Sequence, residues 1–106
     1  MSNSTPISKK ALLIDTLQQH RNEIRAYGVD KMGLFGSFLQ DDLIKPTSDI
    51  DLLIDFVPSK KNYDNYIELY FFLETLTGRK IELVTRESLS PYIGPHILNK
   101  VEDVGI

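Results

Sequence analysis

The sequence contains no cysteine, which excludes disulfide frameworks, thiolate zinc sites and cysteine nucleophiles. It also lacks a long apolar run, since stretches such as residues 52–54 and 70–73 are far shorter than the roughly 18 residues that a membrane-spanning helix needs. Residues 1–6 have no apolar stretch behind a basic one, so they do not have the pattern of a secretory signal. These absences predict a cytoplasmic protein without a membrane segment.

Positive charge is also scarce, with 12 Lys and Arg against 15 Asp and Glu and a net charge of −3. Proteins that grip nucleic-acid backbones need clustered positive charge, so the composition argues against direct nucleic-acid binding. The acidic composition is compatible with a phosphate ligand that metal ions hold to the protein. The 106 residues, 42% hydrophobic, are typical of one globular domain. We assign residues 1–6 to a flexible tail and residues 7–106 to that domain.

Hydrophobic periodicity predicts an α+β fold with the order α, β, β, α, β, α. Residues 7–27 are expected to form one amphipathic helix that ends at Gly28. Strands are expected at residues 31–35, 49–56 and 80–85, with a short helical turn and a loop over 38–47. A second helix ends at Gly78, a last one starts near Pro95, and a short strand over 103–106 would complete the order.

The strongest strand carries the pattern Asp49-Ile50-Asp51. On an extended strand, residues i and i+2 point the same way about 6.6 Å apart, so both carboxylates can converge on one or two ions. Hard oxygen ligands suit magnesium or manganese, and paired ions promote phosphoryl or nucleotidyl transfer. Glu82 alternates away from the apolar residues of the next strand and could lie beside Asp51 if the strands are neighbours.

Gly36 and Ser37 follow the first strand, where a tight turn is expected. A glycine there lets the backbone approach a phosphate, and nearby amides and the Ser37 hydroxyl can hydrogen-bond phosphate oxygens. This predicts a triphosphate site. By itself a Gly-Ser pair carries no weight, and an Asp-x-Asp alternation is usually a solvated strand face.

Together, residues 33–38 (GLFGSF) and 48–56 (SDIDLLIDF) closely resemble the signature of the minimal nucleotidyltransferases of the DNA polymerase beta superfamily. Residues 78–89 (GRKIELVTRESL) are similar to that family's segment with the third carboxylate. The resemblance covers most of the chain from residue 32 onward. It implies a small mixed β-sheet flanked by helices.

The resemblance also implies site residues and a partner. Asp49, Asp51 and Glu82 would be the catalytic ligands of Mg²⁺, with two ions expected, while Gly36, Ser37 and Ser48 would bind the nucleotide. Many minimal members are antitoxins paired with a HEPN-domain ribonuclease toxin. By this resemblance the protein would transfer AMP from ATP to a tyrosine hydroxyl of such a toxin, and form a hetero-oligomer with it.

The chain departs from the family pattern at three points. Residues 38–42 (FLQDD) replace a small residue, Arg and Gly, the loop before Asp49 is one residue longer, and Glu82 replaces the usual Asp. The Arg of the family pattern would place a positive charge near the nucleotide phosphates, and Lys45 or Arg79 could supply that charge instead. The departures leave open a second hypothesis, an antitoxin that acts by binding alone, and a third, transfer to RNA or a small molecule.

Several other residues favour structural roles. Asp55 is expected to be solvated or paired with a lysine, and both histidines are expected to face solvent or bond locally. The tyrosines at 63, 66 and 70 are expected mainly in the core. Of Phe71 and Phe72, at least one should be exposed, which would suggest an interface.

Overall fold

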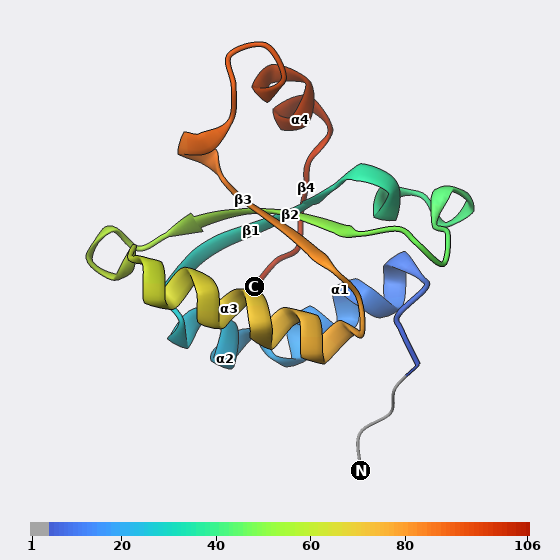
Figure 1. Ribbon diagram of the computed structural model, residues 1–106, viewed down its shortest axis with the longest axis horizontal. Coiled ribbons are helices and arrows are strands. Elements are labelled where there is room, and N and C mark those ends of the chain that lie inside the picture. Colours follow the sequence, from blue (N-terminus) through green and yellow to red (C-terminus); the bar gives the residue numbers. More distant parts are fainter. Residues whose placement is uncertain (1–4) are drawn as a thin grey trace.

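The computed structural model describes residues 5–106, built around a four-stranded sheet with strand order β3-β2-β1-β4 (Figure 1). The strands are β1 (Val29–Phe35), β2 (Ile50–Phe56), β3 (Ile81–Thr85) and β4 (Glu102–Asp103). β1 is antiparallel to β2 and to β4, whereas β2 and β3 are parallel. The sheet is therefore mixed, which confirms the predicted α+β fold class.

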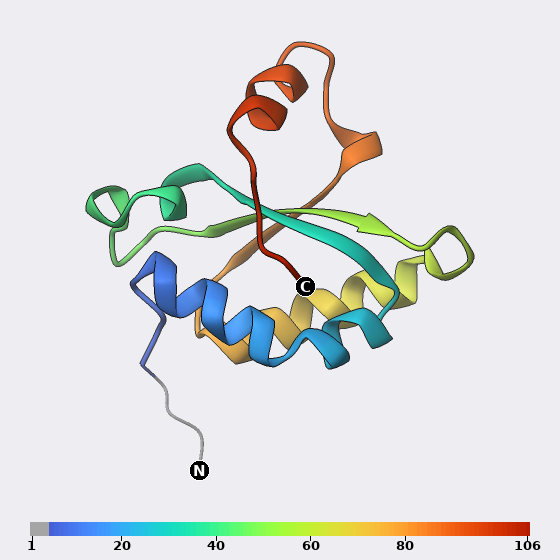
Figure 2. The same ribbon diagram turned by 180° about the vertical axis from the view of Figure 1, so that it is seen from behind.

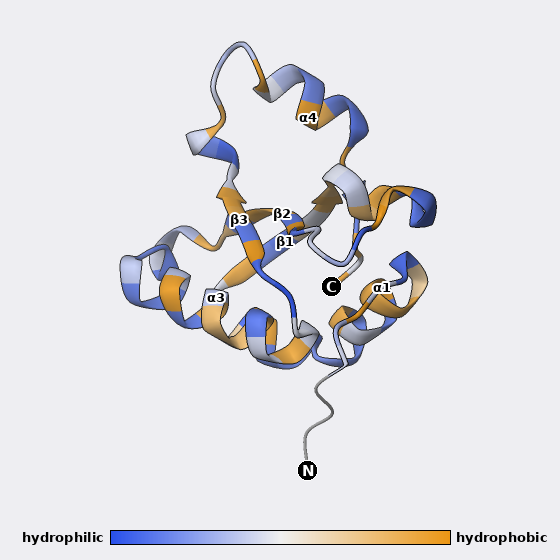
Figure 3. Ribbon diagram, turned by 45° about the vertical axis from the view of Figure 1, so that its right-hand side comes forward, coloured by the Kyte–Doolittle hydropathy of each residue, from blue (hydrophilic) through white to orange (hydrophobic). Residues whose placement is uncertain are grey.

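Helices α1 (Lys10–Gln19), α2 (Arg21–Ala26) and α3 (Tyr63–Thr77) cover one face of the sheet, as both views show (Figures 1 and 2). The arch that contains α4 (Gly94–Lys100) stands on the opposite side (Figure 3). Short 3₁₀ turns occur at Gly36–Leu39 and Asp41–Leu43 after β1, at Pro58–Lys60 after β2 and at Arg86–Ser88 after β3. We call the face opposite α1–α3 the open face of the sheet.

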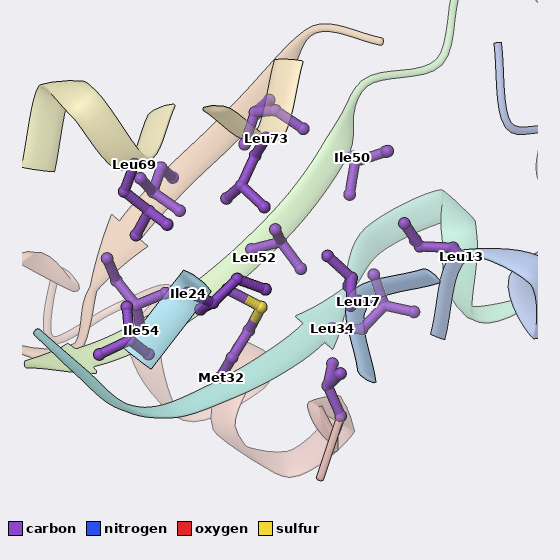
Figure 4. Packing of buried hydrophobic residues seen from close by; sticks show 14 of the residues in the cluster. Leu13, Leu17, Ile24, Met32, Leu34, Ile50, Leu52, Ile54, Leu69 and Leu73 are labelled. Atoms are coloured by element: carbon purple, nitrogen blue, oxygen red, sulfur yellow. The ribbon is translucent and has the colours of Figure 1, made fainter. Parts of the chain in front are cut away.

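The core lies between the sheet and α1–α3 (Figure 4). Ile50, Leu52 and Ile54 of β2 are fully buried in it because alternate strand residues face the helices. Asp51 and Asp55 alternate with them and lie on the open face. The helices contribute the buried side chains Leu13, Leu17, Ile24, Leu69 and Leu73.

The prediction of one helix over residues 7–27 is wrong. The helix starts at Lys10 and breaks at His20, whose φ and ψ of −105° and 20° leave the helical region. The His20 ring nitrogen Nδ1 lies 3.0 Å from the Thr16 carbonyl oxygen, which gives that carbonyl a side-chain partner at the break. Leu17 and Ile24 are both buried on either side of the break, so their spacing could not reveal it.

The segment before α1 is extended and tied to the end of α3. Ile7 is 7% exposed, and its amide donates to the Thr77 carbonyl oxygen at 3.0 Å. The tail assigned to residues 1–6 lies mostly outside the described residues, which begin at residue 5. The division into a tail and one domain therefore stays a prediction.

Helix α3 ends at Gly78, as its sequence predicts. The Asn62 side chain accepts a hydrogen bond from the Asn65 amide, and Gly78 closes the helix with a φ of 69°. Phe72 packs against Tyr27, with ring centroids 5.6 Å apart, while Phe71 is 57% exposed, which confirms that one of the two phenylalanines points outward.

Tyr63 does not join the core as expected, since it is 73% exposed. It is the first residue of α3, where the helix extends past the core. Tyr66 and Tyr70 are partly buried against the core cluster, as predicted. Within residues 5–106, no helix is long and apolar enough to cross a membrane.

Candidate active site

The carboxylates singled out in the sequence lie on the open face of the sheet. Asp51 pairs in register with Glu82 across the parallel strands β2 and β3, so both side chains leave the sheet on the same side. Asp49 immediately precedes β2 and is exposed. Glu82 thus takes the position that its alternation allowed, beside Asp51. The structure brings three acidic residues to one region.

Gly36 is placed directly against this cluster because β1 ends opposite Asp51, through the pair Phe35 and Asp51. The φ of Gly36 is +77°, a conformation that favours glycine. A Cβ atom at this position would overlap the Asp51 carboxylate oxygen Oδ2 and lie 2.9 Å from Cγ. The absence of a side chain at residue 36 therefore lets the Asp51 carboxylate lie against the backbone turn.

The environment of Asp51 disfavours its charged form. Burial, followed by the nearby charges of Glu82 and Asp49, raises the pKa of Asp51 from 3.8 to about 6. Asp51 is half-buried, whereas the other two acids are exposed. A cation bound beside Asp51 would reverse both causes of the rise, since it would neutralise the like charges and replace lost solvation.

The donor set fits a hard divalent cation such as Mg²⁺, because carboxylate oxygens are its preferred protein ligands. In the described part of the chain, however, no three His, Cys, Asp or Glu side chains already converge closely enough to hold one ion. The exposed side chains of Asp49 and Glu82 would have to turn toward Asp51. The three acidic residues therefore fit a metal ion in their ligand chemistry and in their positions on the strands. The side chains of Asp49 and Glu82 would complete the coordination by rotating.

Ser37 and Ser48, which were predicted to bind the nucleotide, are both half-buried. Ser37 lies in the turn after β1, and Ser48 directly precedes Asp49. The Ser37 carbonyl accepts a hydrogen bond from the Gln40 amide at 3.3 Å, within the 3₁₀ turn after β1. The Ser48 hydroxyl oxygen accepts from the Lys45 amide at 2.8 Å and so stabilises the loop before Asp49. Its hydrogen stays available for donation to a ligand.

Arg79 has a role that the sequence did not reveal. It is 8% exposed, and its guanidinium donates to the Ile7 carbonyl at 2.7 Å, the Lys45 carbonyl at 2.8 Å and the Ser48 carbonyl at 3.0 Å. The guanidinium carbon also lies 5.1 Å from the centre of the Phe38 ring. Arg79 thus fixes the loop that carries Asp49 rather than replacing a phosphate-binding cation. No periodic signal marks such a residue, because its acceptors are backbone carbonyls far away in the sequence.

Asp55 lies on the open face of β2 but is engaged elsewhere. Both its oxygens accept from the Arg86 guanidinium, at 3.1 and 3.0 Å, so its partner is an arginine and not the expected lysine. Lys61 instead pairs with Glu87 at 3.1 Å. The Arg86 pair leaves Asp55 outside the acidic cluster.

Known proteins are similar to this chain in sequence and in fold. Residues 17–104 match the family described as nucleotidyltransferase domain. The chain is 38% identical over 88 residues to the protein adenylyltransferase MntA of Thermococcus cleftensis, which covers 80% of this chain and 85% of that protein. A structure described as a candidate minimal nucleotidyltransferase superposes with a TM-score of 0.67 at 24% identity, covering 84% of this chain and 93% of that one.

A mutant MntA–HpeT toxin–antitoxin structure also superposes, with a TM-score of 0.57 at 17% identity, covering 91% of this chain and 71% of that one. At these identities the two superpositions show a shared fold. The family match and the sequence relative extend over most of the chain, and the family match includes all of β1, β2 and β3. These matches confirm the resemblance seen in the motifs of the sequence. The chain therefore belongs to the nucleotidyltransferase domain family and is related within it to the MntA protein adenylyltransferase of Thermococcus cleftensis.

Proposed function

We propose that this protein transfers AMP from ATP to a hydroxyl group of another protein and acts as an antitoxin. The observation that carries the proposal is the placement of Asp51 in register with Glu82 on the open face, with Gly36 against the Asp51 carboxylate. The name of the Thermococcus cleftensis relative and the fold shared with the MntA–HpeT complex support it. The expected acceptor is a tyrosine of a HEPN-domain toxin in the cytoplasm.

Asp49, Asp51 and Glu82 would hold Mg²⁺, which when bound neutralises phosphate charge and lowers the pKa of the acceptor hydroxyl. Asp49 and Asp51 would orient the triphosphate, with Gly36 offering backbone that a phosphate can approach closely. The Ser37 and Ser48 hydroxyls would donate hydrogen bonds to phosphate oxygens.

The reaction forms one bond and breaks another. The acceptor oxygen bonds to the α-phosphorus as the bond from that phosphorus to the bridging oxygen breaks, and pyrophosphate leaves. The proton of the acceptor hydroxyl passes to the Glu82 carboxylate, which is exposed on the open face and can serve as general base.

The test is intact-mass spectrometry of a purified HEPN-domain partner after incubation with this protein, ATP and Mg²⁺. We expect added adenylyl mass with the natural sequence and with Asp55→Asn, a matched change on the same strand and face. We expect none with Asp49→Asn combined with Asp51→Asn. Transfer that persists in the double variant would refute the assigned site.

A second candidate is an antitoxin that neutralises its partner by contact alone. It is favoured by Glu82 in place of Asp, by residues 38–42 without a basic side chain, and by the lack of three converged acidic ligands in the described residues. In that case the Asp49 and Asp51 double variant would still protect cells and still form a stoichiometric complex. Lost protection with an intact complex would instead require catalysis.

A further inference from the structure

The arch between β3 and β4, residues 86–101, rises from the side of the sheet that carries the acidic cluster. Its outer end is a short loop between the turn at Arg86–Ser88 and α4. Figures 1 and 2 both show this loop as the part of the arch farthest from the sheet. The loop contains Tyr92, which is 85% exposed, and Ile93, which is 60% exposed. It therefore projects an aromatic and an aliphatic side chain into solvent.

Hydrogen bonds close this loop into a defined turn. The Ser90 hydroxyl oxygen accepts from the Tyr92 amide at 3.2 Å and from the Ile93 amide at 3.0 Å. The Gly94 amide donates to the Ser90 carbonyl oxygen at 2.7 Å. Pro91 adds stiffness because its ring fixes its φ at about −65°. The turn thus holds Tyr92 in its exposed position.

The five tyrosines of the chain differ in the access that solvent and other molecules have to them. The hydroxyls of Tyr66 and Tyr70 donate hydrogen bonds within the chain, and the Tyr27 ring packs among the helices. Tyr63 is 73% exposed but begins α3, on the face opposite the acidic cluster. Tyr92 is the tyrosine that is both exposed and on the same side of the sheet as the acidic cluster.

We propose that Tyr92 is itself an acceptor of AMP, and that one copy of this chain transfers AMP to Tyr92 of another copy. The inference rests on the proposed function, transfer of AMP to a tyrosine hydroxyl, and adds this chain as a substrate. A side chain that is 85% exposed does not pack on the open face of its own sheet. A projecting loop can instead enter the open face of a second copy, which α1–α3 leave uncovered.

The transfer follows the same chemistry as transfer to another protein. The Tyr92 hydroxyl oxygen bonds to the α-phosphorus of the ATP held by the second copy, the bond to the bridging oxygen breaks, and pyrophosphate leaves. The phenolic proton passes to the Glu82 carboxylate of the copy that holds the ATP. The product carries a phosphodiester and an adenosine at the end of the arch. Modification would therefore add negative charge and bulk beside the exposed Ile93.

The experiment is mass spectrometry of the whole chain after incubation with ATP and Mg²⁺ and no other protein, followed by trypsin digestion. Cleavage after Arg86 and after Lys100 releases residues 87–100, in which Tyr92 is the single tyrosine. We expect adenylyl mass on this fragment. Tyr92→Phe removes a hydroxyl from an exposed ring and should lose the modification. Tyr63→Phe, the matched change at the other exposed tyrosine, should keep it.

A mixing experiment tests transfer between copies. The acceptor is the chain with Asp49→Asn and Asp51→Asn, labelled with heavy nitrogen so that its mass differs from that of the natural sequence. Alone it should stay unmodified, and mixed with the unlabelled natural sequence it should gain adenylyl mass at Tyr92. Adding Tyr92→Phe to the labelled chain should abolish that gain. Modification confined to the unlabelled chain would overturn transfer between copies.

The outcomes separate this inference from the function on which it rests. Transfer to a purified HEPN-domain partner, with no adenylyl mass on this chain, would overturn the inference and leave the proposed function standing. Adenylyl mass that persists on the Tyr92→Phe chain would overturn the assignment to Tyr92. Absence of transfer to either protein would overturn the proposed function and the inference with it.

Discussion

Replacing Asp51 by asparagine should stabilise the fold when no divalent cation is bound. The rise of its pKa from 3.8 to about 6 means that the native state binds a proton more tightly than the unfolded state. The stability linked to this proton is fully present below pH 3.8 and is lost as the pH rises through about 6. At neutral pH the ionised Asp51 therefore destabilises the metal-free protein, and Asn removes that charge.

The magnitude follows from the same shift. At about 1.4 kcal/mol per pH unit, a rise of this size corresponds to about 3 kcal/mol at most. Because Asp51 is half-exposed, solvent screening reduces the expected gain to about 1 kcal/mol. For a domain of this length, that gain raises Tm by about 4 to 8 °C.

The assay is thermal unfolding followed by circular dichroism in EDTA, at several values from about pH 4 to about pH 8. Asp51→Asn should gain stability over the wild type above about pH 6 and lose that advantage near pH 3.8. The control is Asp55→Asn on the same strand, which removes the same charge but breaks the pair with Arg86 and should not raise Tm. An equal rise in both variants, or no rise in Asp51→Asn, would refute the reasoning.

Three further changes test other parts of the fold. Adding Mg²⁺ should raise the Tm of the wild type and not that of Asp51→Asn, as measured in the same unfolding assay. Gly36→Ala should lower the free energy of unfolding, measured in urea, by about 2 kcal/mol. The left-handed backbone disfavours Ala, and the new Cβ would overlap the Asp51 carboxylate. An unchanged urea midpoint would contradict that contact. Arg79→Met should lower the free energy of unfolding by about 3 kcal/mol or more, because the loop before Asp49 loses its buried hydrogen-bond donor. The same variant should speed amide hydrogen exchange in residues 45–49 more than in α3. An equal increase in both segments would contradict a specific role of Arg79 in holding the loop.

Local patterns in the sequence predicted most of the elements and the faces of the strands. The alternation of Ile50, Leu52 and Ile54 with aspartates fixed which side of β2 faces the helices, because strand side chains alternate with a period of two residues. Gly78 predicted the end of α3, since a left-handed cap favours glycine. The motif around Gly36 and Asp49 was specific enough to predict the family from the order of its residues alone.

The sequence by itself predicted the fold class and the family, which the structure and the family match confirm, and it named Asp49, Asp51 and Glu82 as candidate ligands, because the motifs and periodicities that indicate them are local in the chain. Only the tertiary structure decided that Asp51 lies in register with Glu82, that Gly36 makes room for the Asp51 carboxylate, and that Arg79 holds the loop before Asp49. It also decided that α4 forms one wall of an open pocket beside Gly36. These contacts join residues that are far apart in the chain, and such pairings are set by how strands and loops pack together rather than by any local periodicity.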